Sequence, residues 1–282
     1  MRLGITCYPT YGGSGAVATE LGLSLARRGH EVHFITYDSP FRLRGYAERV
    51  YFHQVETRMG RYPLFDHFPY TLALASKQHE VALREELDLL HVHYAIPHAT
   101  TAYLAREMLR GTRDLRVITT LHGTDITLVG QESSFYAITR FSIERSDAVT
   151  AVSAFLRDET YRAFGCVGCD VRVIPNFVNL EEYRPGPEPR QTGLAPQDHK
   201  LIAHVSNFRE VKRVKDVMRV FARIRRAMPA TLLMIGDGPD RPEAEKEAED
   251  LGVTGDVRFL GRLDQVASLL QACDLFVLPS QT

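Results

Sequence analysis

Residues 2–36 read RLGITCYPTYGGSGAVATELGLSLARRGHEVHFIT and contain an apolar run, a glycine loop, an amphipathic segment and a second apolar run. Arg2 to Cys7 has the short, continuous apolar pattern of a buried strand, and Glu31 to Thr36 repeats it. Between them, residues 15–28 place apolar side chains at helical spacing. A strand, a crossover helix and a second strand form the right-handed unit of a parallel sheet. The stretch therefore predicts an α/β fold.

The same alternation continues through the first half of the chain. Further strands are expected at 50–55, 89–93, 116–121, 148–152 and 171–174, with helices at 70–86, 97–109, 135–145 and 153–164. Helices between successive parallel strands cover both faces of the sheet. We therefore expect a doubly wound, Rossmann-like domain over residues 1–180.

A change of composition separates this domain from a second one. Pro185, Pro187, Pro189 and Pro196 lie in a stretch with few apolar residues, which we interpret as a linker at 181–199. The alternation then restarts, with strands expected at 201–205, 231–235, 257–260 and 275–278 and helices at 214–226, 242–251 and 265–272. We expect a second Rossmann-like domain over 200–282, the two domains facing a cleft. Because the sequence stops directly after a strand, we expect this second domain to be truncated.

Composition and charge exclude several classes of protein. Apolar residues make up 44% and charged residues 24%, as in an ordinary soluble globular protein. Lys and Arg total 34 against 35 for Asp and Glu, so no nucleic-acid partner is expected. No apolar run is long enough to span a bilayer, and the first strand starts at the N-terminus without a signal peptide. We expect a cytoplasmic protein with no membrane partner, and the sequence is compatible with a homo-oligomer.

The loop Gly12-Gly13-Ser14-Gly15 lies between the first strand and its helix. Glycines let a ligand approach the backbone closely, and the free N–H groups of a helix start attract anions. From Gly13 the pattern GSGAVA resembles the dinucleotide-binding fingerprint, and Asp38 lies near the acidic position that follows it. An NAD-dependent dehydrogenase is therefore one candidate function. The other interpretation of the loop is a plain tight turn that binds no ligand. Against the dehydrogenase, residues 8–11 separate the glycines from the strand, whereas the fingerprint follows its strand at once.

The stretch TTLHGTD, residues 119–125, ends another expected strand. Ligands of open α/β sheets bind outside the carboxyl ends of the strands, so its polar side chains are well placed. His122 would hydrogen-bond a sugar hydroxyl or steer a developing charge, unless it only packs in the core. Asp125 would orient His122 or cap the loop.

A histidine cluster follows the neighbouring strand, with His91, His93 and His98 around Tyr94. His91 and His93 alternate along the strand, so they should project to the same face. This arrangement suits packing or substrate contact better than metal binding, because no carboxylate or cysteine partner is evident.

Ser206-Asn207-Phe208-Arg209-Glu210-Val211-Lys212-Arg213 follows the first strand of the second domain. Cations at the start of a helix oppose its dipole, so their presence indicates an anionic ligand rather than a solvated basic surface. They would clamp a diphosphate and stabilise its departure as a leaving group. Gly236-Asp237-Gly238 and Gly261 end the next two strands and form close-approach loops along the same edge.

A metal ion is not expected. The chain has no D-x-D triplet for a metal-bridged diphosphate. Cys166 and Cys169 form a C-x-x-C pair, but a zinc site would need a second pair of similar spacing. We expect structural or incidental thiols here, without a disulfide.

Taken together, these stretches resemble the retaining GT-B glycosyltransferases of the glycogen-synthase-like family. The resemblance runs through nearly the whole chain and is carried by Gly4–Pro9, Gly12–Gly15, His33–Thr36, Ser39–Leu43, His91–His98, Thr119–Gly130, Pro175–Phe177 and His204–Lys212. It implies UDP-N-acetylglucosamine as donor, L-malate as acceptor and retention of the α-configuration, the first step of bacillithiol biosynthesis. It also implies that no metal or other cofactor is required. A glycosyltransferase of the same fold with another acceptor is the second alternative.

The resemblance also suggests roles for individual residues. The acceptor would lie near Gly13, Ser14, Tyr94 and Thr120; the donor near Gly15, Ser206, Asn207, Gly236, Asp237, Leu260 and Gly261; and His122, Arg209 and Lys212 would be catalytic. Among these, His122 would face the sugar, Lys212 matches the phosphate-binding lysine, and Leu260 with Gly261 would meet the uracil through the backbone.

Two departures from the family pattern matter. Asn207 stands where the family usually has arginine, so Arg209 or Arg213 would supply that charge. The family's paired glutamates would begin just beyond Thr282, so we expect that this fragment lacks part of the donor site and its activity.

Overall fold

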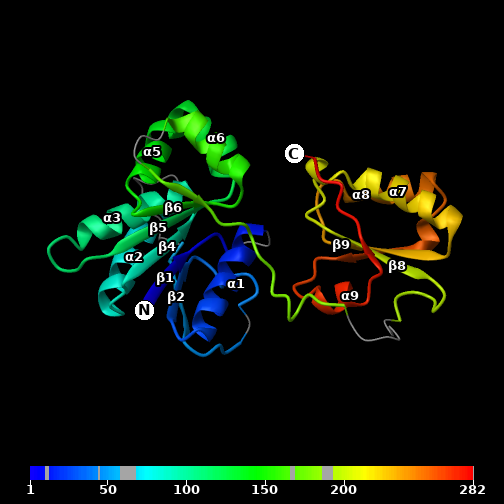
Figure 1. The fold of residues 1–282 in the computed structure, drawn as a ribbon, viewed down its shortest axis with the longest axis horizontal. Coiled ribbons are helices and arrows are strands. Elements are labelled where there is room, and N and C mark those ends of the chain that lie inside the picture. Colours follow the sequence, from blue (N-terminus) through cyan, green and yellow to red (C-terminus); the bar gives the residue numbers. More distant parts are fainter. Residues whose placement is uncertain (10–12, 44, 58–67, 166–168, 186–192, 282) are drawn as a thin grey trace. The chain divides into compact units, whose positions relative to one another are not determined.

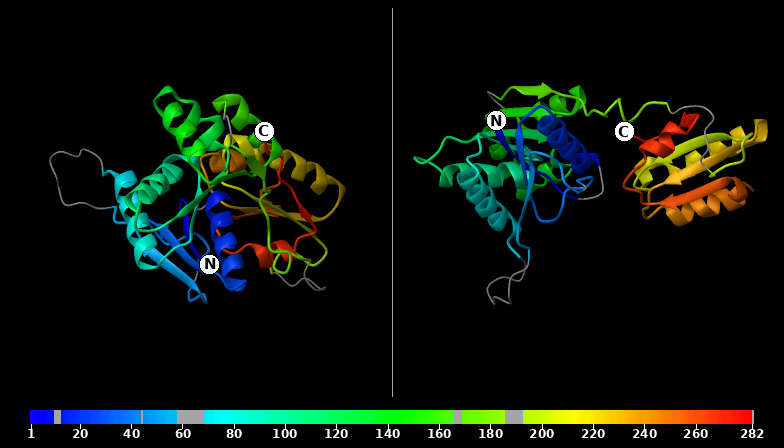
Figure 2. Two further views of the ribbon diagram at one scale, coloured as in Figure 1. Left: turned by 60° about the vertical axis from the view of Figure 1, so that its left-hand side comes forward. Right: turned by 90° about the horizontal axis from the view of Figure 1, so that it is seen from below.

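The computed structural model describes residues 1–9, 13–43, 45–57, 68–165, 169–185 and 193–281 (Figure 1). The chain divides into two compact units, Met1–Phe177 and Val178–Thr282. Each unit is built around one parallel sheet with helices on both of its faces (Figures 1 and 2). The expectation of two Rossmann-like, doubly wound sheets is therefore confirmed.

The first sheet has seven parallel strands in the order β3-β2-β1-β4-β5-β6-β7. They are β1 (Arg2–Thr6), β2 (Glu31–Thr36), β3 (Val50–Gln54), β4 (Leu89–His93), β5 (Arg116–Leu121), β6 (Ala148–Ala151) and β7 (Val171–Val173). The strand order reverses direction between β1 and β4, which pair in register from Leu3↔Leu89 to Thr6↔Val92. Such a switch point opens a crevice at the carboxyl ends of the two strands.

The faces of this sheet are covered by different helices. Helix α1 (Gly13–Arg27) packs with Ile5 and Phe34, while α2 (Tyr70–Arg84) and α3 (Thr100–Met108) pack with Leu90 and Val92. The alternation of side chains along each strand produces these two separate apolar clusters. A third cluster joins α4 (Thr124–Thr127) and α6 (Ala154–Phe164) to β5 and β6, and α5 (Ser133–Glu144) packs nearby.

The second sheet is smaller, with four parallel strands in the order β10-β9-β8-β11. Its elements are β8 (Lys200–Val205), α7 (Val214–Ala227), β9 (Ala230–Ile235), α8 (Arg241–Asp250), β10 (Val257–Gly261), α9 (Ala267–Gln271) and β11 (Leu275–Phe276). Helices α7 and α8 cover one face of this sheet and α9 the other (Figure 1). Strands β8 and β11 flank the switch point of this unit.

The sequence predictions differ from the structure in a few places. The helix expected at 97–109 is divided into a short turn at Ala95–Ala99 and α3, and α4 was not expected. The last strand covers only Leu275–Phe276 rather than 275–278, because it pairs with β8 alone and only over those two residues.

The prediction for the cysteines is wrong at Cys169, which is disulfide-bonded. The expected compartment of the whole chain does not decide the state of an individual cysteine. Cys166 lies outside the described residues. Cys7 and Cys273 do not form disulfide bonds.

Candidate active site

Ser14 and Tyr94 meet at the switch point of the first sheet. Ser14 belongs to the first turn of α1, and Tyr94 follows the last residue of β4. The Tyr94 hydroxyl donates to Ser14 Oγ at 2.9 Å, so two residues 80 positions apart are held together. The Ser14 hydroxyl proton stays available to a ligand. The first turn of α1 carries no acidic side chain, so it keeps the anion-attracting character of a helix start.

Tyr94 has a strained backbone that aims its ring into the crevice. Its φ is 83°, in the left-handed region that a bulky side chain rarely adopts, and its N–H donates to the Thr120 carbonyl at 2.8 Å. The ring centroid lies 5.6 Å from that of Tyr8 and 5.1 Å from that of His122. Strain of this kind persists where the surroundings hold it, and it is concentrated at functional sites.

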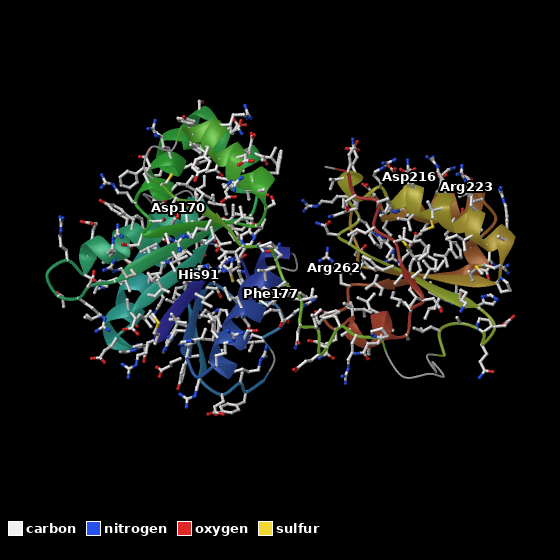
Figure 3. The ribbon with its side chains drawn as sticks, viewed as in Figure 1. His91, Asp170, Phe177, Asp216, Arg223 and Arg262 are labelled. Carbon is white, nitrogen blue, oxygen red and sulfur yellow. The ribbon has the colours of Figure 1, made fainter. Side chains whose placement is uncertain are left out.

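Three imidazole rings stack beside Tyr94. His91 and His93 lie 4.9 Å apart by ring centroids, and His93 and His122 lie 5.0 Å apart. The prediction that His91 and His93 share a face is therefore confirmed; His91 is labelled among the strands of the first unit in Figure 3. His93 Nδ1 lies 2.8 Å from His122 Nε2, a hydrogen bond between the two rings.

Thr120 is buried beside the histidine column, the stacked rings of His91, His93 and His122. It is 8% exposed, and its hydroxyl lies 2.7 Å from His91 Nε2 and 2.8 Å from the Thr150 hydroxyl. The hydroxyl therefore links β4, β5 and β6. Any acceptor contact by Thr120 would have to share its oxygen with these two partners.

Burial keeps the histidines of the column neutral. Desolvation lowers the pKa of His91 and of His122 to about 4, and it lowers the pKa of His93 well below the usual value. Neighbouring imidazoles lower the pKa values of His93 and His122 further, since each disfavours a second positive charge. At neutral pH His122 therefore offers one N–H donor and one acceptor nitrogen.

Asp125 braces the loop and does not contact the His122 ring. One carboxylate oxygen accepts from the N–H of Ala95 at 2.9 Å, and the other accepts from Gly123 at 3.1 Å and from His122 at 3.3 Å, all through the backbone. Of the two roles considered for Asp125, the structure shows the loop cap. Burial raises the pKa of this carboxyl, and hydrogen bonds from backbone N–H groups oppose that rise.

A pocket of about 430 Å³ opens beside these residues. Tyr94 and Tyr8 form part of its wall, and most of the rest is apolar. Its other lining residues are Thr71, Ile96, Pro97, Thr100, Thr124, Asp125, Val129, Phe135 and Ile138. Gly13 is exposed at the start of α1, whereas Gly15, two residues later, is buried and its carbonyl accepts from the Thr19 hydroxyl.

Lys212 lies at the switch point of the second sheet. It ends a short helical turn (Glu210–Lys212) after β8, and its Nζ reaches Ser280 Oγ, beyond β11, at 3.5 Å. His204 links the same two strands, since its ring contacts the Val277 carbonyl and Ser206 Oγ at 2.8 and 2.7 Å. Lys212, a half-buried residue, thus places its ammonium at the edge where a parallel sheet binds ligands.

The two arginines beside Lys212, Arg209 and Arg213, differ in their ion-pair partners. Arg213 forms an ion pair with Asp216 on α7, which Figure 3 labels, with guanidinium nitrogens 2.6 and 2.7 Å from one carboxylate oxygen. Arg209 is exposed and has no ion pair within the described part of the chain. Asn207 has a buried side-chain oxygen with no hydrogen-bond partner among those same residues.

Two glycine loops pack closely around Ser206. A side chain at Gly236 would place its Cβ 1.8 Å from the Ser206 carbonyl oxygen, and one at Gly238 would place it 2.4 Å from the Asn207 carbonyl oxygen. Gly236 also donates to the Gly261 carbonyl at 2.7 Å. The ends of β8, β9 and β10 therefore form one continuous edge.

Leu260 occupies a bulge in β10. Phe259 pairs with Met234 and Gly261 with Ile235, so Leu260 is an extra residue without a position in the ladder. Its side chain packs against the apolar cluster that contains Leu233 and Ile235. Bulges release backbone groups from pairing and occur often beside active sites. Asp237 accepts from the Gly238 N–H at 2.9 Å, which closes the adjacent turn.

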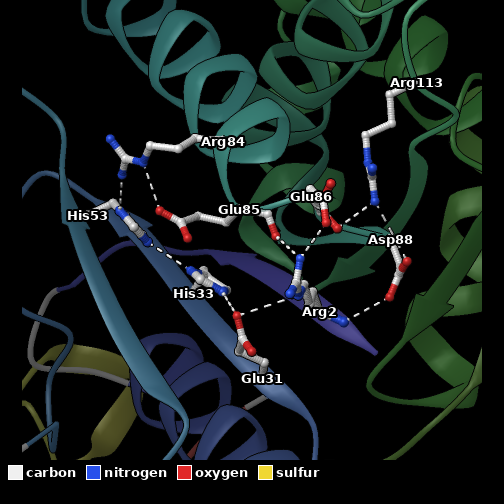
Figure 4. A network of polar contacts seen from close by, with 9 residues as sticks. All are labelled: Arg2, Glu31, His33, His53, Arg84, Glu85, Glu86, Asp88 and Arg113. Carbon is white, nitrogen blue, oxygen red and sulfur yellow. Dashed lines mark hydrogen bonds and ion pairs between the residues drawn. The ribbon is translucent and has the colours of Figure 1, made fainter.

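Another histidine pair, His33 and His53, belongs to a separate polar network (Figure 4). Their rings are joined by a 2.9 Å hydrogen bond, and His33 also contacts Glu31 at 3.0 Å. Arg2 connects this group to Glu86 through an ion pair (Figure 4). Arg2 and Glu31 begin their strands, so much of this network lies at the edge away from the switch point and supports the fold.

Two absences concern only the residues that the structure describes. Within them, no three His, Cys, Asp or Glu side chains are grouped so as to hold a metal ion. Nor does any helix in those ranges have the length and apolar character to traverse a bilayer.

Comparison with known proteins assigns the chain to a family. Residues 11–182 match the model of Glycosyltransferase Family 4, and residues 187–282 match that of Glycosyl transferases group 1. The chain belongs to Glycosyltransferase Family 4, and its two parallel sheets are those of a GT-B glycosyltransferase. It is 47% identical over 283 residues to the N-acetyl-alpha-D-glucosaminyl L-malate synthase of Bacillus anthracis, covering 100% of this chain and 73% of that protein.

Solved structures agree on the fold. The sucrose-phosphate synthase of Thermosynechococcus elongatus superposes with a TM-score of 0.71 at 17% identity, over 99% of this chain and 75% of that one. Anabaena Alr3699/HepE, solved with UDP and glucose, superposes with a TM-score of 0.70 at 17% identity, over 99% and 74%. The family assignment does not favour the dehydrogenase.

Some residues of these sites were not singled out in the sequence. Thr150, Ser280 and Tyr8 acquire their contacts only when strands far apart in the chain become neighbours. The available signal was position, since each of them lies at or just after the carboxyl end of a strand.

Proposed function

We propose that this protein transfers N-acetylglucosamine from UDP-N-acetylglucosamine to L-malate with retention of configuration. The observation that carries the proposal is the 47% identity to an N-acetyl-alpha-D-glucosaminyl L-malate synthase, which extends over the whole of this chain. The resemblance found in the sequence places this reaction first in bacillithiol biosynthesis. The first sheet presents polar hydroxyl groups at its switch point, and the second sheet presents the ammonium of Lys212, as a transferase with an anionic donor requires.

The second unit would hold the donor. Lys212 and Arg209 would neutralise the diphosphate, Arg209 because, unlike Arg213, it has no ion pair in the described residues. Ser206, Asn207, Gly236 and Asp237 would line the sugar-nucleotide along the edge of the sheet, and the bulge at Leu260 and Gly261 would offer backbone groups to the uracil. The proposal assigns the charge on the leaving group to protein cations and invokes no metal.

The first unit would hold the acceptor. The carboxylates of malate would bind at the start of α1, near Gly13 and Ser14, where helix N–H groups favour an anion. The Tyr94 hydroxyl fixes Ser14, and Thr120 supports the histidine column behind them. His122 would contact the transferred sugar, and Gly15 would let the backbone approach it.

The chemical step would be a displacement on one face of the sugar. The malate hydroxyl oxygen forms a bond to the anomeric carbon while the bond from that carbon to the UDP oxygen breaks, the electron pair leaving with UDP. The hydroxyl proton passes to the departing phosphate oxygen, so no general base of the protein is needed. Lys212 and Arg209 would stabilise the charge that develops on UDP.

Calorimetric titration of UDP, UDP-N-acetylglucosamine and NAD tests this assignment at the level of binding. We expect UDP and the UDP-sugar to bind and NAD to give no heat of binding. Binding of NAD without binding of UDP would contradict the proposal and return the glycine loop to the dehydrogenase interpretation.

A further inference from the structure

His93 is a buried imidazole with one clear hydrogen bond. It is 1% exposed at the end of β4, stacked against both His91 and His122. Its Nδ1 lies 2.8 Å from His122 Nε2, and its own Nε2 is buried without a partner among the described residues. Neither the family assignment nor the comparisons give this residue a role.

The unpartnered nitrogen indicates which way the hydrogen bond runs. A neutral imidazole carries its proton on one nitrogen only. If His93 carried it on Nε2, a buried N–H donor would be left without an acceptor, and such orphaned donors are rare because they are costly. If His93 carries it on Nδ1, the orphaned atom is an acceptor, and Nδ1 donates to His122 Nε2.

The hydrogen bond from His93 also fixes the tautomer of the His122 ring. His122 Nε2 accepts from His93, so the proton of neutral His122 must be on Nδ1. No hydrogen bond of the described residues uses that Nδ1, and it is not a buried atom. It is therefore free to meet a ligand.

We propose that His93 is a positioning residue that holds His122 in the Nδ1–H tautomer, so that His122 presents a hydrogen-bond donor to an oxygen atom of the substrate. The catalytic consequence of this tautomer rests on the proposed glycosyl transfer. The assignment of the tautomer does not depend on which reaction the protein catalyses. His122 would thus serve as a donor and not as a general base, in agreement with a reaction whose proton leaves with the phosphate.

Neighbouring contacts keep the pair in place. The His98 ring hydrogen-bonds the His93 carbonyl, and Asp125 accepts from the His122 backbone N–H at 3.3 Å. The low pKa of His122, about 4 through burial, excludes the doubly protonated ring near neutral pH. His93 is therefore the one group described that selects between the two neutral forms.

Nitrogen-15 NMR of the histidine-labelled full-length protein reads the tautomer directly. Loss of one ring's signals in His122→Asn assigns them in the wild type. We expect an N–H-type shift at His122 Nδ1 and an unprotonated shift at Nε2. The reverse pattern in the wild-type protein would overturn the proposal, whatever the enzyme's activity and without any variant of His93.

Variants of His93 test the catalytic consequence. The Asn side chain in His93→Asn can place an N–H donor near the position of Nδ1, whereas His93→Leu removes the donor and keeps an apolar body. We expect kcat to fall at least about tenfold in His93→Leu, with mixed His122 tautomers, and to recover most of its value in His93→Asn. An Nδ1–H tautomer that persists in a folded His93→Leu protein would refute the positioning role. A transferase with another substrate would fail the malate assay and yet keep the NMR result.

Discussion

Lys212 reaches across the switch point of the second sheet, and among the described residues its ammonium has one polar contact, with Ser280 Oγ at 3.5 Å. If it stabilises charge on departing UDP, its interaction is stronger in the transition state than in the ground state, so kcat should suffer most. We predict that Lys212→Ala in the full-length protein lowers kcat by about 100-fold. The matched control is Lys215→Ala, because Lys215 forms an exposed ion pair with Glu243 and should leave steady-state kinetics unchanged. Equal kinetics for the two variants would exclude the role given to Lys212.

Arg209 and Arg213 are four residues apart and differ in their partners. Arg213 is paired with Asp216, whereas Arg209 has no ion pair in the described ranges. We predict that Arg209→Ala raises the Kd for UDP by about tenfold, near 1.4 kcal/mol, as expected for one lost charge-assisted hydrogen bond. Arg213→Ala should change it by less than about threefold. Calorimetry on the two variants decides, and a larger effect of Arg213→Ala would reverse the assignment.

Some contacts between individual residues could be predicted from the sequence, and others could not. The alternation of His91 and His93 along a strand was enough to place them on one face, since period two is a local property. The contact of His122 with His93 was not predictable, because it depends on the pairing of β4 with β5 and on the positive φ of Tyr94. For the same reason the sequence could not decide between the two roles of Asp125.

The glycine loop after β9 is the element whose geometry is most constrained. Gly236 has a φ of 120°, and a Cβ there would lie 1.8 Å from the Ser206 carbonyl oxygen, which belongs to backbone and cannot rotate away. We predict that Gly236→Ala destabilises the protein by about 3 kcal/mol or more. Gly255→Ala is the control, since Gly255 faces open space without a positive φ.

Urea unfolding followed by circular dichroism measures both variants. The midpoint should move for Gly236→Ala and stay close to the wild-type value for Gly255→Ala. UDP affinity should fall in the first variant only, because the loop contacts the Ser206 region. Equal midpoints would show that the loop tolerates a side chain and that steric crowding is not the reason for a glycine at position 236.

Most strands and helices follow from local patterns. Buried parallel strands show continuous apolar runs, and the crossovers between them show helical spacing, so their limits were predicted to within a few residues. The bulge at Leu260 and the short helix α4 were not, because both depend on tertiary contacts. The bulge arises from pairing with β9, and Asp125, within α4, accepts from the N–H of Ala95.

Buried histidines make the stability of the first unit depend on pH. His98 is fully buried, and desolvation lowers its pKa from 6.5 to about 4. Below pH 6.5 the unfolded chain therefore binds a proton that the folded chain refuses until about pH 4. The free energy of unfolding should fall between these pH values, by about 3 kcal/mol for this residue alone, and be flat above pH 7.

Tyrosine fluorescence can follow this unit almost by itself. The chain has 12 tyrosines and no tryptophan, and only Tyr183 follows Phe177. Urea unfolding between pH 7 and pH 4 should show the fall, and His98→Asn, which cannot take up the proton, should show a smaller one. The comparison uses the slope with pH, because removing the ring also changes the baseline stability. Identical slopes would mean that His98 titrates normally.

The whole molecule is proposed to couple two sheets with complementary tasks, a cationic edge for a sugar nucleotide and a polar crevice for a small dicarboxylate. The most direct test is turnover of UDP-N-acetylglucosamine and L-malate by the full-length protein, with the product followed by mass spectrometry and its anomeric configuration by proton NMR. We predict one α-linked N-acetylglucosaminyl malate for each UDP released. No malate product, or a β-linked one, would contradict the account.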